Sequence, residues 1–304
     1  MKDYVQKIID KNKNLFNNNS KIEKINIGFT NTLYSIDNKY ILKICSLESN
    51  NKNFLNEIDF YLKNKNNPYI PKLYDYFKSN KKEEFSYLVL EKVNGKSLYC
   101  LWHLFDENKK EETIMKICNL MKSFHSCKGE KYDWGNFIID KLNTNLNKCI
   151  EKNLFDKPII EDCKYILDRI NIPLESNNFH LVHSDIHFDN ILLTDDDRLI
   201  IIDFETSIYA PLDYELDIFL RMCNNPLKYA SKETEKYIKK EDYKDIEKKL
   251  KKYYPQLFEF KYYVIRHTIY DLEANLRLLP RFPKDNELKT NVINIIMKLK
   301  ETLN

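Results

Sequence analysis

The residues best suited to chemistry are concentrated in one segment, 181–205, which reads LVHSDIHFDNILLTDDDRLIIIDFE. Within it, Asp185 precedes Asn190 by five positions, and Asp203 ends an apolar run 13 positions after Asn190. Two short strands joined by the triple-Asp turn at 195–197 would form a hairpin that brings Asn190 beside Asp203. A carboxylate and an amide oxygen that converge are hard ligands suited to Mg²⁺ beside substrate phosphates. Asp185 would face the same point, so the segment offers the parts of phosphoryl transfer: metal ligands and a carboxylate that orients the attacking hydroxyl.

This segment resembles the catalytic region of a known enzyme superfamily. The H-x-D-x-x-x-x-N pattern at 183–190, followed by I-D-F at 202–204, is similar to the aminoglycoside phosphotransferase and choline kinase superfamily, which shares the protein-kinase-like fold. The D-I-H at 185–187 is close to the D-L-H variant that is frequent in that family. The resemblance extends over about residues 25–220 and implies a kinase-like enzyme.

The resemblance gives each polar residue of the segment a role. Asp185 would be the catalytic base or the residue that positions the acceptor hydroxyl, and Asn190 and Asp203 would bind Mg²⁺. His183 would brace the catalytic loop, and His187 is a candidate for a phosphate or acceptor contact. A single Asp in a loop is usually only a turn residue, but the two motifs at this spacing favour the functional interpretation.

Two further groups needed by a kinase-like fold occur in the first 93 residues. Such a fold places a lysine on its third strand to bind the nucleotide phosphates and a glutamate on the next helix to hold that lysine. Lys43 lies in the apolar run 40–44, where a lysine is costly unless it is paired. Glu57 lies on the predicted helix at 50–65, so an ion pair with Lys43 is predicted for the nucleotide-bound state. The alternative is an edge-strand lysine and a surface carboxylate.

Two stretches are expected to contact the nucleotide. The loop I-G-F-T-N resembles the G-x-T-N loop of choline-kinase-like members: Gly28 permits a tight turn, and Thr30 and Asn31 would reach phosphate oxygens together with backbone N–H groups. Glu91 and Val93 belong to the predicted hinge, whose backbone groups commonly contact the nucleobase. With only four glycines, the chain has neither a G-x-G-x-x-G fingerprint nor a G-x-x-x-x-G-K-[ST] phosphate loop.

Two features downstream distinguish this chain from protein kinases. Glu205 follows the I-D-F motif where a protein kinase has Gly, and no A-P-E motif is present. Both departures favour a small-molecule acceptor over a protein. Asp217 lies in a stretch similar to the family's P-x-x-x-D-L/I-A region, where the Asp usually holds the backbone of the catalytic loop, so the resemblance implies a structural role.

The acceptor site is expected among the C-terminal helices. A cluster of carboxylates would suit a polycationic acceptor such as an aminoglycoside, whereas an aromatic cage would suit a quaternary ammonium such as choline. Most of the tyrosines and acids in a helical region are core or solvated residues, so the sequence leaves this choice open. The candidate acceptor or phosphate contacts are His187, Glu205, Asp213, Asp271 and Glu273, with Glu215 as a further acid.

Hydrophobic periodicity predicts the elements that position these residues. A short amphipathic helix is expected within residues 1–20 and a second helix at 50–65. Strands are predicted at 24–28, 31–36, 40–45, 74–78 and 85–93, and helices at 110–127, 143–170 and through much of 213–304. The predicted fold is α+β and bilobal, with a five-stranded N-terminal lobe at 1–93, a mainly helical C-terminal lobe at 94–304 and a hinge at about 90–96.

Composition limits the class of protein. The 304 residues carry 49 basic and 46 acidic side chains, a net charge of +3 that gives no argument for nucleic-acid binding. The seven cysteines include no C-x-x-C pair, so reduced thiols and a cytoplasmic location are expected. No signal-peptide core or membrane-length apolar run is present, so no membrane association is expected, and a monomer is favoured.

These observations predict a Mg²⁺-dependent kinase that moves the γ-phosphoryl group of ATP or GTP to a hydroxyl of a small, cationic acceptor. An aminoglycoside is the leading acceptor, which would connect the protein with antibiotic resistance. Choline, ethanolamine, thiamine or a similar metabolite is the alternative. A catalytically silent kinase-like scaffold is a second alternative, although a scaffold has no need to keep all of Lys43, Asp185, Asn190 and Asp203. Protein kinase activity is a third.

Overall fold

The computed structural model describes residues 2–17, 19–25, 31–45, 51–79, 85–230 and 232–304. The chain divides into two compact units. Unit 1 comprises Met1–Phe124, Asp185–Ser207 and Leu227–Asp242, and unit 2 comprises His125–Ser184, Ile208–Pro226 and Tyr243–Asn304. These units group the chain differently from the predicted lobes, because residues beyond 94 contribute to both; the lobe boundary near 90–96 stays a prediction.

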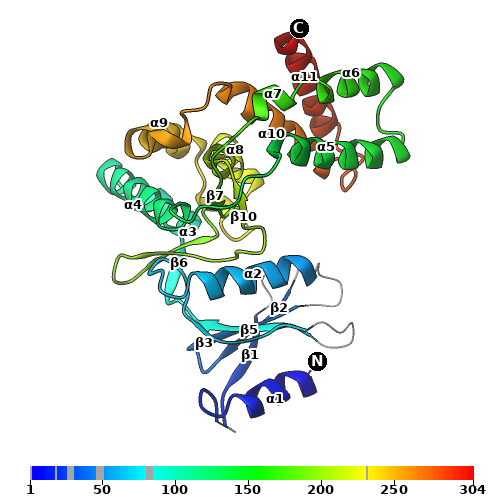
Figure 1. Cartoon of the computed structure of the whole chain (residues 1–304). Coiled ribbons are helices and arrows are strands. Elements are labelled where there is room, and N and C mark those ends of the chain that lie inside the picture. The colour runs from blue at the N-terminus through cyan, green and yellow to red at the C-terminus, as the bar shows by residue number, and fades with distance from the viewer. Residues whose placement is uncertain (1, 18, 26–30, 46–50, 80–84, 231) are drawn as a thin grey trace. The chain divides into compact units, whose positions relative to one another are not determined.

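Unit 1 contains the predicted five-stranded sheet, which is antiparallel with the strand order β1-β2-β3-β5-β4 (Figure 1). The turn between β2 and β3 is made by Asp37 and Asn38, with φ values of 52° and 55°. Both values are left-handed, as a two-residue hairpin turn requires, and Asp and Asn tolerate them. The strands are β1 Ile22–Ile25, β2 Asn31–Ile36, β3 Tyr40–Cys45, β4 Leu73–Phe77 and β5 Tyr87–Glu91.

Two helices cover opposite faces of this sheet (Figure 1). Helix α1 (Lys2–Lys11) shares one hydrophobic core with the side chains of Leu42 and Ile44 on β3. Successive side chains of a strand point to opposite faces, so Lys43 points to the other face, which α2 (Asn51–Lys63) covers. The strand period therefore places a buried lysine against the helix that carries Glu57.

A second, three-stranded sheet in unit 1 has the order β6-β8-β9. A Cβ atom added to Gly95 would lie 2.8 Å from the carbonyl oxygen of Leu193, so a glycine allows β6 to approach β8 this closely. Its strands are β6 Gly95–Ser97, β8 Ile191–Thr194 and β9 Leu199–Ile201. The helices around it are α3 Leu98–Leu101, η1 Trp102–Leu104, α4 Glu107–His125, η4 Glu235–Tyr237 and η5 Lys240–Tyr243, and η3 Pro226–Lys228 lies at the boundary.

Unit 2 is mainly helical, as predicted, and has its own hydrophobic core. Trp134 and Tyr270, each 1% exposed, lie in this core, and the indole N–H of Trp134 donates a 3.0 Å hydrogen bond to the Tyr270 hydroxyl. Its helices are α5 Trp134–Glu151, α6 Lys157–Leu167, α7 Asn171–Leu174, η2 Leu212–Glu215, α8 Leu216–Asn224, α9 Ile246–Tyr253, η6 Pro255–Leu257, α10 Tyr263–Leu278 and α11 Asn286–Leu303. The strands β7 (His180–Val182) and β10 (Ile208–Ala210) pair antiparallel.

One helix prediction differs from the structure. The helical region expected at 143–170 contains two helices, α5 and α6, and the first begins nine residues earlier, at Trp134. Asp133 caps that start, because its side chain accepts a hydrogen bond from the backbone N–H of Asn136. Asn153, with φ 52°, ends the first helix in a left-handed conformation, and Pro158 lies in the first turn of the second.

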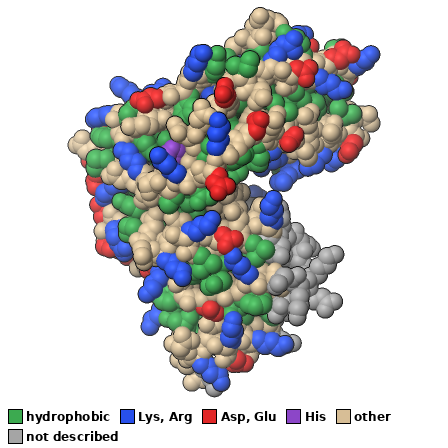
Figure 2. Space-filling view, viewed as in Figure 1, with side chains coloured by type: hydrophobic (Ala, Val, Ile, Leu, Met, Phe, Trp, Pro, Cys, Tyr) green, Lys and Arg blue, Asp and Glu red, His purple; other side chains and the backbone are tan. Residues whose placement is uncertain are grey.

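The surface carries mixed charge. On the face that Figure 2 shows, Lys and Arg side chains are spread over the molecule and interspersed with acidic ones. All seven cysteines are free thiols. Among the described residues, none of the helices combines the length and the apolar character needed to span a membrane.

Candidate active site

Strands β8 and β9 form the predicted hairpin, and its register places two of the predicted metal ligands. Ile191 pairs with Ile201, and the N–H of Ile202 donates a 3.0 Å hydrogen bond to the carbonyl of Asn190. Asn190 and Asp203 therefore occupy neighbouring positions at the open end of the hairpin. Asp203 has φ 70°, a left-handed conformation that is uncommon outside glycine and is frequent at functional sites.

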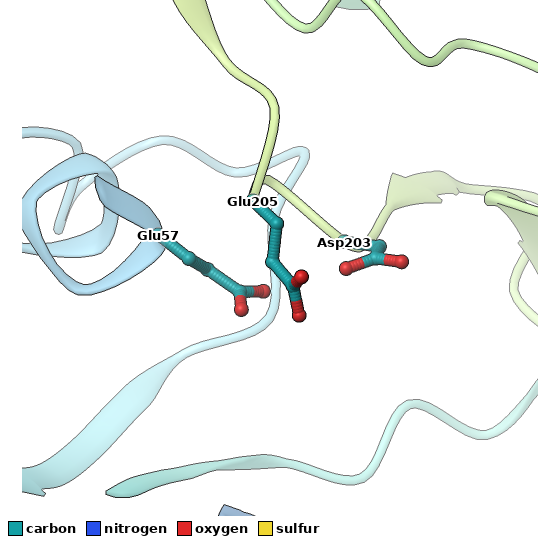
Figure 3. A group of neighbouring side chains, drawn as sticks. All are labelled: Glu57, Asp203 and Glu205. Atoms are coloured by element: carbon teal, nitrogen blue, oxygen red, sulfur yellow. The ribbon is translucent and has the colours of Figure 1, made fainter. Parts of the chain in front are cut away.

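Lys43 is surrounded by three carboxylates. Its Nζ atom lies 2.7 Å from Glu57, 2.9 Å from Asp203 and 2.8 Å from Glu205. Figure 3 shows the three acidic side chains converging, Glu57 from α2 and the other two from the segment that follows β9. Oxygen atoms of the three carboxylates lie within 4.8 Å of one another. The Lys43–Glu57 pair is thus present, and its persistence with a bound nucleotide stays a prediction.

The pKa values of Lys43 and Glu57 are both raised, although for different reasons. Burial alone would lower the pKa of Lys43, but the charges of Glu57, Asp203 and Glu205 outweigh it and hold that pKa well above its usual value. For Glu57, burial raises the pKa to about 7, against the opposing charge of Lys43 and with the support of the two neighbouring carboxylates. The lysine therefore stays charged over the whole physiological range.

The loop between β7 and β8 holds Asp185 in a defined setting. The side-chain amide nitrogen of Asn190 donates a 3.0 Å hydrogen bond to the carbonyl of Asp185. Because the amide nitrogen bonds to the loop backbone, the amide oxygen of Asn190 is the atom that suits a cation. The backbone N–H of Asp189 donates to Nδ1 of His187, whose Nε2 lies 4.0 Å from the Asp185 carboxylate. His187 thus lies beside the predicted catalytic carboxylate.

The segment after Asp203 is anchored to α2. Phe204 is fully buried and stacks on Phe60 with ring centroids 3.7 Å apart. The side-chain amide of Asn56 donates hydrogen bonds to the carbonyl of Glu205 at 3.2 Å and to that of Ser207 at 2.7 Å. These contacts fix the backbone from which Asp203 and Glu205 extend toward Lys43.

Glu215 has a role that the sequence analysis did not assign. In unit 2 its carboxylate accepts hydrogen bonds from the backbone N–H groups of His183 at 2.8 Å and Ser184 at 3.0 Å. Ser184 has φ 61°, so these bonds hold a strained backbone just before Asp185. Nε2 of the buried His125 lies 2.9 Å from the same carboxylate. The sequence does show an acid at this position, two residues before Asp217. Spacing alone, however, could not tell whether Glu215 or Asp217 contacts the loop.

Asp213 and Asp217, the acids on either side of Glu215, pair with arginines. Asp217 lies 2.5 Å from Nη2 of Arg221, and burial raises its pKa to about 6 despite that positive charge. Asp213 is fully buried and forms two contacts with Arg266, at 2.5 and 2.9 Å. Asp213, a candidate acceptor contact, is thus enclosed in the core of unit 2. The loop-supporting role of Asp217 stays a prediction, as does that of His183, which is fully buried.

The remaining acceptor candidates lie on α10. Glu273 is 4% exposed and accepts a 3.1 Å hydrogen bond from Asn145, with Lys141 at 3.7 Å and Arg277 at 3.8 Å. Asp271 is partly buried, and this burial raises its pKa. Both carboxylates are therefore placed beside donors of this chain.

The predicted nucleotide contacts are only partly described. Gly28 and Thr30 lie outside the described residues. Asn31 begins β2, Glu91 ends β5, and Val93 follows two residues later. The carboxylate of Glu91 accepts a hydrogen bond from the backbone N–H of Lys72, the residue before β4. This bond connects β5 with the start of β4.

Similar structures identify the fold. The chain has 15% identity to aminoglycoside phosphotransferase APH(2'')-Ib bound to ADP, with a TM-score of 0.68 and coverage of 99% of this chain and 97% of that one. The streptomycin–ATP–APH(2'')-IIa ternary complex gives 15% identity, a TM-score of 0.69 and coverage of 97% and 95%. Aminoglycoside phosphotransferase APH(4)-Ia gives 14%, 0.61 and 99% of each chain. At this identity the likeness establishes the predicted kinase-like fold and no more.

Sequence similarity establishes more than the fold. No curated protein matches the chain. The sequence profile of the phosphotransferase enzyme family, however, matches residues 21–229, which is more than half of the 304 residues. The match includes Lys43, Glu57 and the whole 181–205 segment, so the residues clustered in unit 1 lie inside the matched region. The chain therefore belongs to the phosphotransferase enzyme family.

Proposed function

We propose that this phosphotransferase moves the γ-phosphoryl group of ATP or GTP, with Mg²⁺, onto a hydroxyl of a small, cationic acceptor. One observation carries the donor half of the proposal: Lys43 lies 2.9 Å from Asp203, whose hairpin neighbour is Asn190. The lysine proposed to bind phosphate and the two oxygen donors proposed to bind a metal thus belong to one cluster in unit 1. Phosphoryl transfer relies on such positioning and charge neutralisation rather than on covalent chemistry by the protein.

The nucleotide would be held by its phosphates and its base. Lys43, oriented by Glu57, would bind the phosphates, together with the loop that carries Gly28, Thr30 and Asn31. Backbone groups near Glu91 and Val93 would contact the base. The support is the burial of the Lys43–Glu57 pair, since both side chains are at most 10% exposed and a pair this buried is costly unless it is used.

Asn190 and Asp203 would hold Mg²⁺. The donor set fits, because both offer hard oxygen ligands and the acids around Lys43 exceed its single positive charge. The ion, when bound, supplies positive charge to the phosphate oxygens. Asn190 fixes its own amide orientation through the carbonyl of Asp185, so the metal ligand and the catalytic loop are connected.

Asp185 would orient the acceptor hydroxyl. The hydroxyl oxygen forms a bond to the γ-phosphorus while the bond from phosphorus to the bridging oxygen of the diphosphate breaks. The hydroxyl proton passes to the Asp185 carboxylate late in this step. The side chain of Asp185 is 37% exposed, so an acceptor can reach it.

The acceptor class is the least constrained element of the proposal. One of the similar solved proteins is an aminoglycoside phosphotransferase by name, and another is solved in a complex with streptomycin and ATP, which favours an aminoglycoside. Asp271 and Glu273 on α10 would be the acids for its amino groups, and each would exchange a hydrogen bond within this chain for one from the acceptor. Choline, ethanolamine or thiamine is the alternative, because tyrosines such as Tyr214 lie near Glu273.

A product assay tests this proposal. Purified protein with Mg²⁺ and ATP or GTP is incubated with aminoglycosides, choline, ethanolamine and thiamine, and phosphorylated products are detected by mass spectrometry. A product with wild type that Asp185→Asn does not form supports the proposal. Asp196→Asn, in the exposed turn of the hairpin, is the matched control and should keep wild-type turnover. Nucleotide binding without product from any acceptor would instead support the catalytically silent scaffold.

A further inference from the structure

We propose that Glu205 is a latch on Lys43: its carboxylate occupies the place on the lysine that a polyphosphate group takes on binding, and it must leave before the anion can bind. The inference rests on the proposed function only for the identity of the natural ligand. It concerns unit 1 alone, and it assigns to Glu205 control over anion access.

The number of hydrogen bonds that Lys43 can donate is limited. A lysine ammonium has three N–H donors and no acceptor. Three carboxylates lie within hydrogen-bond distance of Nζ, Glu57 at 2.7 Å, Asp203 at 2.9 Å and Glu205 at 2.8 Å. Glu57 and Asp203 accept hydrogen bonds from Nζ, and Glu205 forms an ion pair with it at 2.8 Å. Three carboxylates thus surround the ammonium, and a phosphate oxygen can reach it only if one of them withdraws.

Side-chain length and burial identify the carboxylate that withdraws. The Glu57 side chain is 1% exposed, so its departure would leave a buried charge without its partner. Asp203 has a short side chain on a backbone fixed at φ 70°, so its carboxylate cannot move far. Glu205 has an additional methylene group, while its backbone is held by Asn56. Rotation of its side chain alone can release Lys43 without moving the backbone.

Asn31 contacts the same carboxylate oxygen of Glu205 as Lys43 does. Its side-chain amide nitrogen donates a hydrogen bond to Oε1 of Glu205, across 174 positions of sequence. The amide oxygen of Asn31 is buried and has no hydrogen-bond partner among the described residues. Departure of Glu205 thus releases two donors at once, the ammonium of Lys43 and the amide of Asn31, and both suit an anion.

The charge of the cluster gives the latch a functional consequence. The carboxylates of Asp203 and Glu205 and the ammonium of Lys43 leave a formal charge of −1 around the lysine when Glu57 is protonated and −2 when Glu57 is ionised. A polyphosphate approaching without a metal ion meets this negative charge and the engaged lysine together. Glu205 therefore makes anion binding depend on a divalent cation, and metal-free nucleotide is excluded.

Calorimetry of tripolyphosphate binding without divalent cations tests the latch. Glu205→Gln keeps the shape of the side chain and removes its charge. This variant should bind metal-free tripolyphosphate about 10- to 100-fold more tightly than wild type, the range that one hydrogen bond between charged groups is worth. With saturating Mg²⁺ and ATP the difference between the two proteins should shrink, because the cation offsets the charge of Glu205.

The matched control is Asp59→Asn on the same helix as Glu57. Asp59 is 49% exposed and pairs with Lys78, so its loss removes a carboxylate charge from unit 1 without touching Lys43. It should bind tripolyphosphate as wild type does. If Glu205→Gln unfolds, Glu205→Asp, which is too short to reach Lys43 from the same backbone, should change affinity in the same direction.

Equal metal-free affinity of Glu205→Gln and wild type would overturn the latch. A tenfold gain in Asp59→Asn would also overturn it, since net charge alone would then explain the effect. Failure of wild type to bind Mg²⁺–ATP and Mg²⁺–GTP would contradict the proposed function, but the tripolyphosphate comparison would still decide the latch.

Discussion

Lys43 and Asp203 lie 2.9 Å apart, although 160 positions of sequence separate them. The contact joins the lysine of the five-stranded sheet to the acid at the end of the β8–β9 hairpin. The proposed phosphate-binding lysine and the proposed metal ligand are thereby placed in contact, with Glu57 and Glu205 completing the cluster. Substitutions at these four residues should therefore distinguish the contributions to metal binding, to phosphate binding and to the chemical step.

Asp203→Ala is expected to abolish Mg²⁺-dependent turnover while the fold is kept. The side chain is 44% exposed, so its removal leaves no large cavity. Turnover with ATP or GTP and the accepted hydroxyl substrate should fall below detection, and calorimetry should show weaker binding of Mg²⁺–nucleotide. Circular dichroism and thermal unfolding check the fold. Wild-type turnover at matched Mg²⁺ would remove Asp203 from the site.

The free energy of unfolding should depend on pH through Glu57. Burial raises its pKa to about 7 in the folded state, compared with about 4.3 for an exposed glutamate. Between these values the folded state binds more protons than the unfolded state, so this residue makes stability fall as pH rises through the window. Glu57→Gln should reduce this fall.

Urea unfolding from pH 4.5 to 7.5 measures the effect of Glu57. Glu112→Gln, which removes a surface carboxylate from α4 that pairs with Lys109 and Lys116, is the matched control. The control should keep the wild-type dependence in this window. Identical pH profiles for Glu57→Gln and wild type would show that the folded-state pKa of Glu57 is not raised.

Asp185→Asn should affect the chemical step rather than nucleotide binding. The substitution keeps the shape of the side chain and removes the charge that orients and deprotonates the hydroxyl. We expect kcat to fall by about 10²–10⁴-fold, the usual contribution of such a group. The affinity for Mg²⁺–nucleotide, measured by calorimetry, should stay close to that of wild type. An unchanged kcat would reject the proposed mechanism.

Glu215→Gln should destabilise the loop before Asp185. The carboxylate accepts two backbone hydrogen bonds and contacts His125, all within the core of unit 2. An amide offers only one acceptor oxygen and turns an NH₂ group toward one of these donors, so a loss of about 1–3 kcal/mol in the free energy of unfolding is expected.

Glu259→Gln is the control for Glu215, because Glu259 is exposed on the same unit. It should leave the free energy of unfolding unchanged within error. Hydrogen exchange of the His183 and Ser184 amides gives a local measurement, and both should exchange faster in Glu215→Gln. Unchanged exchange would show that Glu215 does not hold this backbone.

The local parts of the site depend on residues that are close together in the sequence. An Asp-rich turn between two apolar runs specifies a hairpin, and the period of two in β3 sends Lys43 to the face opposite Leu42 and Ile44. Both features depend on neighbours a few positions away, so they could be predicted before the fold was known. The family motif at 183–204 then connected the hairpin to phosphoryl transfer.

The partner of each acid, in contrast, depends on how distant segments of the chain pack together. Glu205 reaches Lys43 and Asn31, Glu215 accepts hydrogen bonds from the loop N–H groups, and Asp213 is buried against an arginine. Each contact joins segments that are 31 to 174 positions apart. Acids within one short motif look alike in sequence because spacing fixes neither their burial nor the direction of their side chains. Packing of distant segments assigns each acid its partner, and with it a role in the core, in the loop or on the lysine.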